Sequence, residues 1–108
     1  MVLVIARVRC GPEQRDRLIE LGREMQEKSR REDGCLSYSF YTAIEDPLSC
    51  VAVEEWTDRA ALDRHFTQPH LQEFTRALGE LISERPEVAI HEVADTEPIP
   101  REVGHTEG

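Results

Sequence analysis

The side chain best suited to proton transfer in this sequence is His65. An imidazole has an unperturbed pKa of about 6.5, so it exchanges protons readily at neutral pH. His65 follows Ala61 and Leu62 by four and three positions, which places it beside the apolar stripe of the helix that these residues predict. The alternative is a structural histidine that is partly buried and hydrogen-bonded to a backbone carbonyl or to Glu54. We predict that His65 is a base, and the structural alternative stays open.

A carboxylate and an indole precede this helix on one face of a predicted strand. Ala52, Glu54 and Trp56 alternate with their neighbours and therefore point the same way. Glu54 could orient His65 and raise its basicity, or form a structural ion pair with Arg7 on the first strand. Trp56 could line a pocket with its indole N–H free to bind a substrate oxygen, or anchor the helix to the sheet.

Three more side chains are candidates for contact with a ligand. Tyr38 lies on the predicted inward face of its strand and offers a phenol to an oxyanion, although packing is the usual role of a strand tyrosine. His70 begins a helix and could reach the mouth of a cleft, or it is an exposed histidine of the capping turn. Phe74 lies on the apolar stripe of that helix, where it belongs to the core and could also touch a substrate.

The sequence does not predict a metal site. His65 and His70 are five positions apart across a helix break, and no compact set of carboxylates accompanies them. Cys10, Cys35 and Cys50 are an odd number without CxxC spacing, which supports neither a disulfide framework nor a zinc knuckle.

The composition limits the class of protein and its partners. A chain of 108 residues has room for one domain and one hydrophobic core. Its 13 Lys and Arg against 22 Asp and Glu give a net charge of −9, which disfavours nucleic acid and anionic membranes as partners. No segment approaches the roughly 20 apolar residues of a membrane span, and residues 1–7 have the pattern of a strand rather than of a signal peptide. We expect a cytoplasmic protein.

The candidate residues are carried by elements that the apolar periodicity predicts. Alternation predicts strands at residues 2–9, 35–41, 49–56 and 88–93. Helical spacing predicts three helices, and their apolar stripes are Leu18, Leu21 and Met25, then Ala61, Leu62 and His65, then Leu71, Phe74, Leu78 and Leu81. This order is the split β-α-β-β-α-β arrangement of an α+β, ferredoxin-like domain, with a four-stranded antiparallel sheet and its helices on one face.

The second face of such a sheet needs a cover. If the helices take the other face, Val2, Val4 and Val51 would make this one apolar, so we predict a homodimer that forms sheet to sheet. We assign residues 1–95 to the domain. Residues 96–108 hold two prolines, two glycines and several charges without an apolar period, and we expect an extended or disordered tail. Cover by the tail alone is the alternative to the dimer.

Several segments, in this order, resemble the antibiotic-biosynthesis monooxygenase family over about residues 2–95. They are Glu32-Asp33-Gly34-Cys35-Leu36-Ser37-Tyr38, Asp46-Pro47, Glu54-Glu55-Trp56-Thr57-Asp58, Ala60-Ala61-Leu62-Asp63-Arg64-His65 and Pro69-His70. The resemblance implies a dimeric α/β barrel that oxidises an electron-rich aromatic, such as a hydroquinone or an anthrone, with O2 and without metal or flavin. His65, Tyr38 and Trp56 would then be catalytic, and substrate contacts would come from Glu54, Arg7, His70 and Phe74.

Particular residues bear on other activities known for the same fold. Pro69-His70 is similar to a motif of isomerases that process autoinducer-2, but a lysine of those enzymes is replaced here by Thr57. A heme-degrading branch has an asparagine and a histidine where this chain has Ala6 and Phe74-Thr75, which argues against heme. A non-catalytic domain that binds a small ligand or acts in stress response is the alternative of a different class.

Overall fold

The computed structural model describes residues 1–100; residues 101–108 of the predicted tail lie outside the described part. The elements are β1 (Val2–Arg9), the 3-10 turn η1 (Pro12–Gln14), α1 (Arg15–Arg30), β2 (Cys35–Thr42), β3 (Ser49–Trp56), α2 (Arg59–Phe66), α3 (Pro69–Leu78) and β4 (Glu87–Glu92). The predicted β-α-β-β-α-β order is confirmed, with the second crossover divided into α2 and α3. No helix within residues 1–100 has the length and apolar character to cross a membrane.

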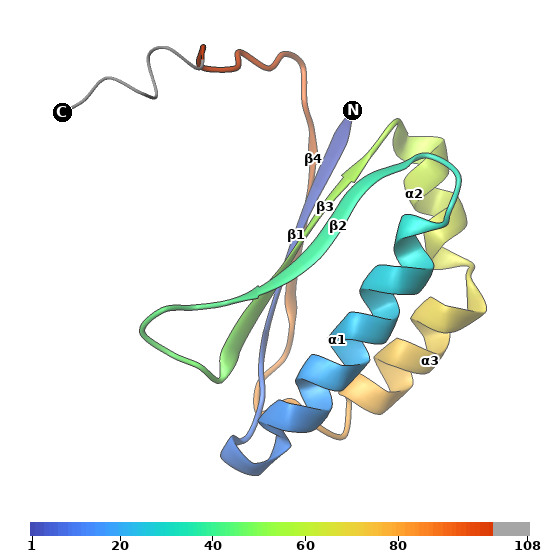
Figure 1. The fold of residues 1–108 in the computed structure, drawn as a ribbon. Helices are drawn as coiled ribbons and strands as arrows, with labels where there is room; N and C mark the ends of the chain where they lie inside the picture. Colours follow the sequence, from blue (N-terminus) through green and yellow to red (C-terminus); the bar gives the residue numbers. More distant parts are fainter. Residues whose placement is uncertain (101–108) are drawn as a thin grey trace, which may run out of the picture.

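The strands form one antiparallel sheet in the order β2-β3-β1-β4, and all three helices lie on one of its faces (Figure 1). The α+β, ferredoxin-like fold predicted from the sequence is therefore confirmed. The register places Glu54 of β3 opposite both Val4 of β1 and Tyr38 of β2. Residues that are directly opposite in an antiparallel pair share a face, so these three side chains point together toward the helices.

The register also corrects one expectation about the sheet. Val2 lies opposite Trp56 and Val4 opposite Glu54, and both valines are buried beneath the helices. Their predicted place on the second face is wrong, because strand residues two apart share a face and this face belongs to the core. Only Val51 was assigned correctly. The half-buried apolar side chains on the open face include Leu3, Ile5, Val51, Val53 and Ala89.

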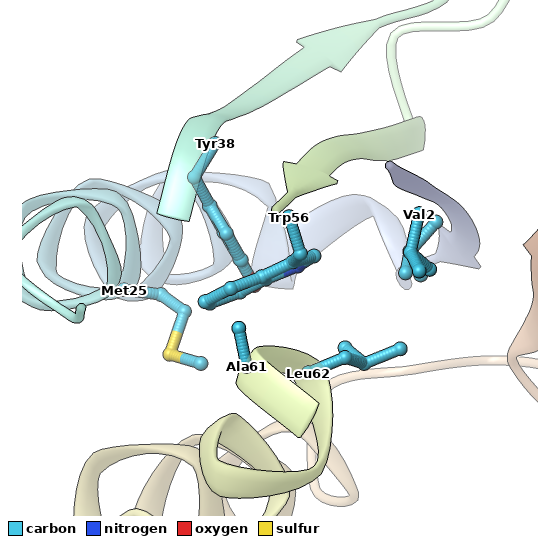
Figure 2. Packing of buried hydrophobic residues seen from close by; sticks show 7 residues of the cluster. Val2, Met25, Tyr38, Trp56, Ala61 and Leu62 are labelled. Atoms are coloured by element: carbon cyan, nitrogen blue, oxygen red, sulfur yellow. The ribbon is translucent and has the colours of Figure 1, made fainter. Parts of the chain in front are cut away.

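The core under α2 is built around Trp56, which is fully buried. Figure 2 shows Tyr38 and Trp56 extending from the sheet toward Ala61 and Leu62 of α2. The helix begins directly after this strand because the side chain of Asp58 accepts a hydrogen bond from the backbone N–H of Ala61 at 2.8 Å. The position of α2 relative to β3 is thus set by a buried aromatic and a cap.

A glycine holds the turn between α1 and β2 against the start of α2. Gly34 has φ +88°, and a Cβ there would lie 2.5 Å from the Cβ of Ala61 and 2.9 Å from Oγ1 of Thr57. Its carbonyl accepts a hydrogen bond from the N–H of Thr57 at 2.8 Å. Only glycine combines this backbone conformation with so close an approach. The turn carries Glu32, so Gly34 also determines where that carboxylate lies.

The substitution Gly34→Ala should lower the free energy of unfolding by more than about 2 kcal/mol, since left-handed backbone and a steric clash act together. Gly79→Ala is the matched control, because Gly79 has φ −56° and a Cβ there would meet only ordinary contacts of 3.5 Å and more. We expect the control to be neutral or slightly stabilising. Urea unfolding of both variants measures the difference; equal effects would contradict the role given to Gly34.

Candidate active site

An apolar cavity of about 300 Å³ lies between the sheet and the helices α2 and α3. Phe66 and Val88 at its rim are exposed, so it opens to solvent there. The apolar cavity has walls that include Val4, Ala6, Phe40, Leu71, Phe74 and Leu78, and its polar groups come from Tyr38, Glu54, His65 and Thr75. A concave apolar site with a few converging polar groups is the usual form of a small-molecule site.

Behind the apolar cavity, one carboxylate joins two histidines. Oε2 of Glu32 lies 2.7 Å from Nδ1 of His65 and 2.7 Å from Nε2 of His70. The side chains of Glu32, His65 and His70 are only 10%, 2% and 15% exposed. They come from the turn after α1, the last turn of α2 and the first turn of α3. We call Glu32, His65 and His70 the Glu-His-His cluster.

The hydrogen bond to Glu32 decides which nitrogen of His65 is available. An ionised carboxylate only accepts hydrogen bonds, so Nδ1 of His65 donates and Nε2 keeps its lone pair. Burial lowers the pKa of His65 from its ordinary value, against the bond to Glu32, which raises it. The imidazole is therefore neutral at pH 7. Its Nε2 lies 4.0 Å from Oε1 of Glu54, on the side of the apolar cavity.

Two acidic groups beside this nitrogen hold protons unusually tightly. Burial raises the pKa of Glu54 to about 7, so a large fraction is protonated near neutral pH. Burial, and then the proximity of Glu54, raise the pKa of Tyr38 above that of an ordinary tyrosine. The phenol is thus a neutral hydrogen-bond donor. The centre of the His65 ring lies 5.7 Å from that of Tyr38.

Trp56 supports these groups from behind and does not line the apolar cavity. Its Nε1 donates a hydrogen bond of 3.0 Å to Oε1 of Glu54, and the centre of its ring lies 4.6 Å from that of His65. The prediction of a free indole N–H in a pocket wall is wrong, because the strand turns the fully buried ring into the core. Trp56 positions Glu54 and His65 instead.

Arg7 lies away from the site. It is exposed and lies opposite Val51 and Glu87 on the open face of the sheet. The predicted ion pair with Glu54 is wrong, because odd-numbered residues of β1 point away from the helices. A substrate in the apolar cavity is likewise out of its reach. Phe74 does line the cavity, with its ring centre 5.8 Å from that of Phe40.

The contacts of Glu32 change two further expectations about the histidines. His70 is not an exposed residue of the capping turn, since it is mostly buried against this carboxylate. The sequence showed no compact set of carboxylates beside His65 and His70, and it missed the single carboxylate, Glu32, that contacts both. Glu32 lies 33 positions before His65, and no periodic pattern connects positions so far apart. Its place in the Glu32-Asp33-Gly34 turn was the only available signal.

Comparison with known proteins agrees with the fold described above. The family model described as antibiotic biosynthesis monooxygenase matches residues 1–77. The Mycobacterium tuberculosis protein "Putative monooxygenase Rv0793" is 38% identical over 76% of this chain and 80% of its own length, and its solved structure superposes with a TM-score of 0.84, covering 90% and 98% of the two chains at 33% identity. An uncharacterised Synechocystis protein is 34% identical over 91% of this chain and 67% of its own length. A crystal structure titled antibiotic biosynthesis monooxygenase has a TM-score of 0.82 and 34% identity, over 88% of this chain and all of that one.

The raised pKa of Glu54 predicts a pH-dependent stability. Between 4.5, its ordinary pKa, and about 7, its pKa in the fold, the folded protein keeps a proton that the unfolded chain has lost. The contribution of Glu54 to the free energy of unfolding therefore falls as the pH rises through this range. Glu54→Gln has no such proton and can still accept the bond from Trp56. Relative to wild type it should gain up to about 3 kcal/mol of stability between pH 5 and pH 8.

Urea unfolding at the two pH values and one protein concentration measures this gain. The exposed Glu80→Gln, just after α3, is the control and should show no such change. A difference between Glu54→Gln and wild type that is the same at both pH values would mean that Glu54 is ionised throughout.

Proposed function

Because the chain belongs to the antibiotic biosynthesis monooxygenase family, we propose that it is a monooxygenase that oxidises a small electron-rich aromatic, such as a hydroquinone or an anthrone, with O2. The observation that carries the proposal is the position of His65 at the apolar cavity, with its Nδ1 2.7 Å from Oε2 of Glu32. This contact leaves Nε2 to accept a proton. We propose further that base catalysis by the protein is sufficient for this reaction.

The proposed oxidation has three requirements that the protein must meet. A phenol or anthrone reduces O2 poorly until it loses a proton, so a base must remove that proton. The anion must be stabilised by hydrogen-bond donors, and water must be excluded. Nε2 of His65 would take the proton, the neutral phenol of Tyr38 would donate to the developing anion, and the apolar walls would exclude water.

An anthrone-like substrate illustrates the balance of the reaction. After His65 takes the first proton, the carbanion gives its electrons to O2 and a peroxide forms at the same carbon. The proton held by His65 passes to the outer peroxide oxygen, and His65 then takes the second C–H proton from this carbon, which breaks the O–O bond and leaves a carbonyl group and hydroxide. The departing hydroxide takes up the proton held by His65 and leaves as water. One oxygen atom of O2 thus enters the product, the other becomes water, and His65 returns to its neutral form.

The size and lining of the apolar cavity support a small aromatic ligand. Its volume of about 300 Å³ is at the low end of ligand pockets. The rings of Phe40 and Phe74 offer flat apolar contacts to a substrate ring, and Leu71 adds an aliphatic contact. Tyr38, Glu54 and His65 meet at one side of the cavity. A hydroxyl or keto oxygen directed at these three groups would orient the ring.

We propose that the protein acts as a homodimer through the open face of the sheet. Ile5 lies on this face between Val53 and Ala89, and a partner subunit would cover all three. Ile5→Glu should weaken the dimer by about 3 kcal/mol or more, because a buried charge would have no partner. Sedimentation velocity across a concentration series measures the dissociation. Ile44→Glu, in the exposed loop between β2 and β3, is the control; equal behaviour of the two variants would contradict this interface.

The proposed reaction is tested by O2 consumption with hydroquinones and anthrones, with rates counted only where they scale with protein concentration. Wild type should consume O2, and His65→Ala should lose about 100- to 10,000-fold in rate, as expected for a general base. The exposed Gln72→Ala on α3, outside the site and the open face of the sheet, is the control. A rate that survives in His65→Ala would contradict the role of His65. The absence of any enzyme-dependent rate across the panel would contradict the oxidation and favour a ligand-binding domain or an isomerase.

A further inference from the structure

The Glu-His-His cluster has the composition of a transition-metal site. One ligand atom from each residue can be chosen so that all three lie within 4.8 Å of one another. Oε2 of Glu32 is 2.7 Å from both Nδ1 of His65 and Nε2 of His70. We propose that this cluster binds one divalent transition-metal ion, of the class of Zn²⁺, Fe²⁺ or Co²⁺. The proposal does not depend on the oxidation reaction.

The donor atoms select this class of ion. Two imidazole nitrogens and one carboxylate oxygen are typical ligands of zinc and of non-heme iron, whereas Mg²⁺ and Ca²⁺ prefer oxygen ligands alone. Three protein ligands also leave a coordination position for water or another small ligand. Within residues 1–100 no other group of three such side chains has this geometry.

The two distances from Glu32 to the histidines require only a small adjustment. Ligands about 2.1 Å from a tetrahedral ion are about 3.4 Å apart, whereas Glu32 now lies 2.7 Å from each histidine nitrogen. The Glu32 side chain would therefore retreat by less than about 1 Å. The two histidine nitrogens belong to different helices, α2 and α3. The fold therefore determines how far apart these two ligands lie.

The cluster can be reached from solvent on the side opposite the apolar cavity. Glu32 and His70 line a surface depression of about 380 Å³ together with Lys28, Arg31 and Arg64. Two of these cations are already paired along α1, Lys28 with Glu24 at 3.7 Å and Arg31 with Glu27 at 3.5 Å. An ion can thus enter without crossing the cavity that a substrate would occupy.

A further carboxylate is in place to support a metal-bound His65. A histidine that binds a metal through one nitrogen commonly donates its other N–H to a carboxylate. With the ion on Nδ1, the ring proton moves to Nε2, which faces Oε1 of Glu54 at 4.0 Å. Glu54 is itself held by the bond from Nε1 of Trp56. The metal form and the base form of His65 are therefore two tautomeric states of the same ring.

Binding is measured by titrating untagged, metal-free protein with Co²⁺ and following its visible absorption, then displacing Co²⁺ with Zn²⁺. We expect one Co²⁺ per chain. Loss of a second-shell partner alone weakens metal sites about 10- to 100-fold, so loss of the ligand in His70→Gln or Glu32→Gln should weaken binding at least about tenfold. Zn²⁺ should also raise the melting temperature of wild type and not that of His70→Gln.

The matched control is His91→Gln, which removes an exposed imidazole and should bind as wild type does. His70→Gln is the decisive variant, because it leaves the bond between Glu32 and His65 in place, and circular dichroism checks its fold. Unchanged Co²⁺ affinity in folded His70→Gln would overturn the proposal, as would the absence of saturable, one-to-one binding by wild type. Oxidation activity is assayed separately in the presence of EDTA, so the failure of one proposal is distinguishable from that of the other.

Discussion

The carboxylate of Glu32 joins three separate parts of the chain, and the candidate site depends on this contact. It accepts hydrogen bonds of 2.7 Å from both His65 and His70. Burying a charge without hydrogen-bond partners costs roughly several kcal/mol. The two hydrogen bonds therefore make the burial of Glu32 possible. The turn that brings it there needs the left-handed backbone of Gly34. A backbone requirement in one loop thus determines which nitrogen of His65 faces the apolar cavity.

Burial acts in opposite directions on the two groups at the centre of the site. It lowers the pKa of His65 and raises that of Glu54 to about 7, so that both are largely neutral in one pH range. Neutral forms suit an apolar cavity, because neither group carries an unpaired charge into it. The same neutrality leaves His65 able to accept a proton or to bind a metal ion. Trp56 maintains this environment by filling the core behind both groups.

The parts of the site that the sequence predicts correctly are those that follow from a local period. Alternation along β3 places Glu54 and Trp56 on one face, and helical spacing places His65 on the inner side of α2. The β-α-β-β-α-β order follows from the same patterns. The contact of Glu32 with His65 spans 33 positions and follows from no local pattern. Arg7 was misplaced because the pairing register, which the periodicity of a single strand does not contain, decides which residues share a face.

The central claim is that Glu32 holds His65 with its proton on Nδ1 and its lone pair on Nε2. Nitrogen-15 NMR of the histidine rings in metal-free protein measures this tautomer and the pKa of His65 directly. The account predicts the Nδ1–H tautomer in wild type, with a pKa below that of an ordinary histidine. In Glu32→Gln the pKa should fall further, since the carboxylate raises it. An Nε2–H tautomer in wild type, or a pKa unaffected by Glu32→Gln, would contradict the account.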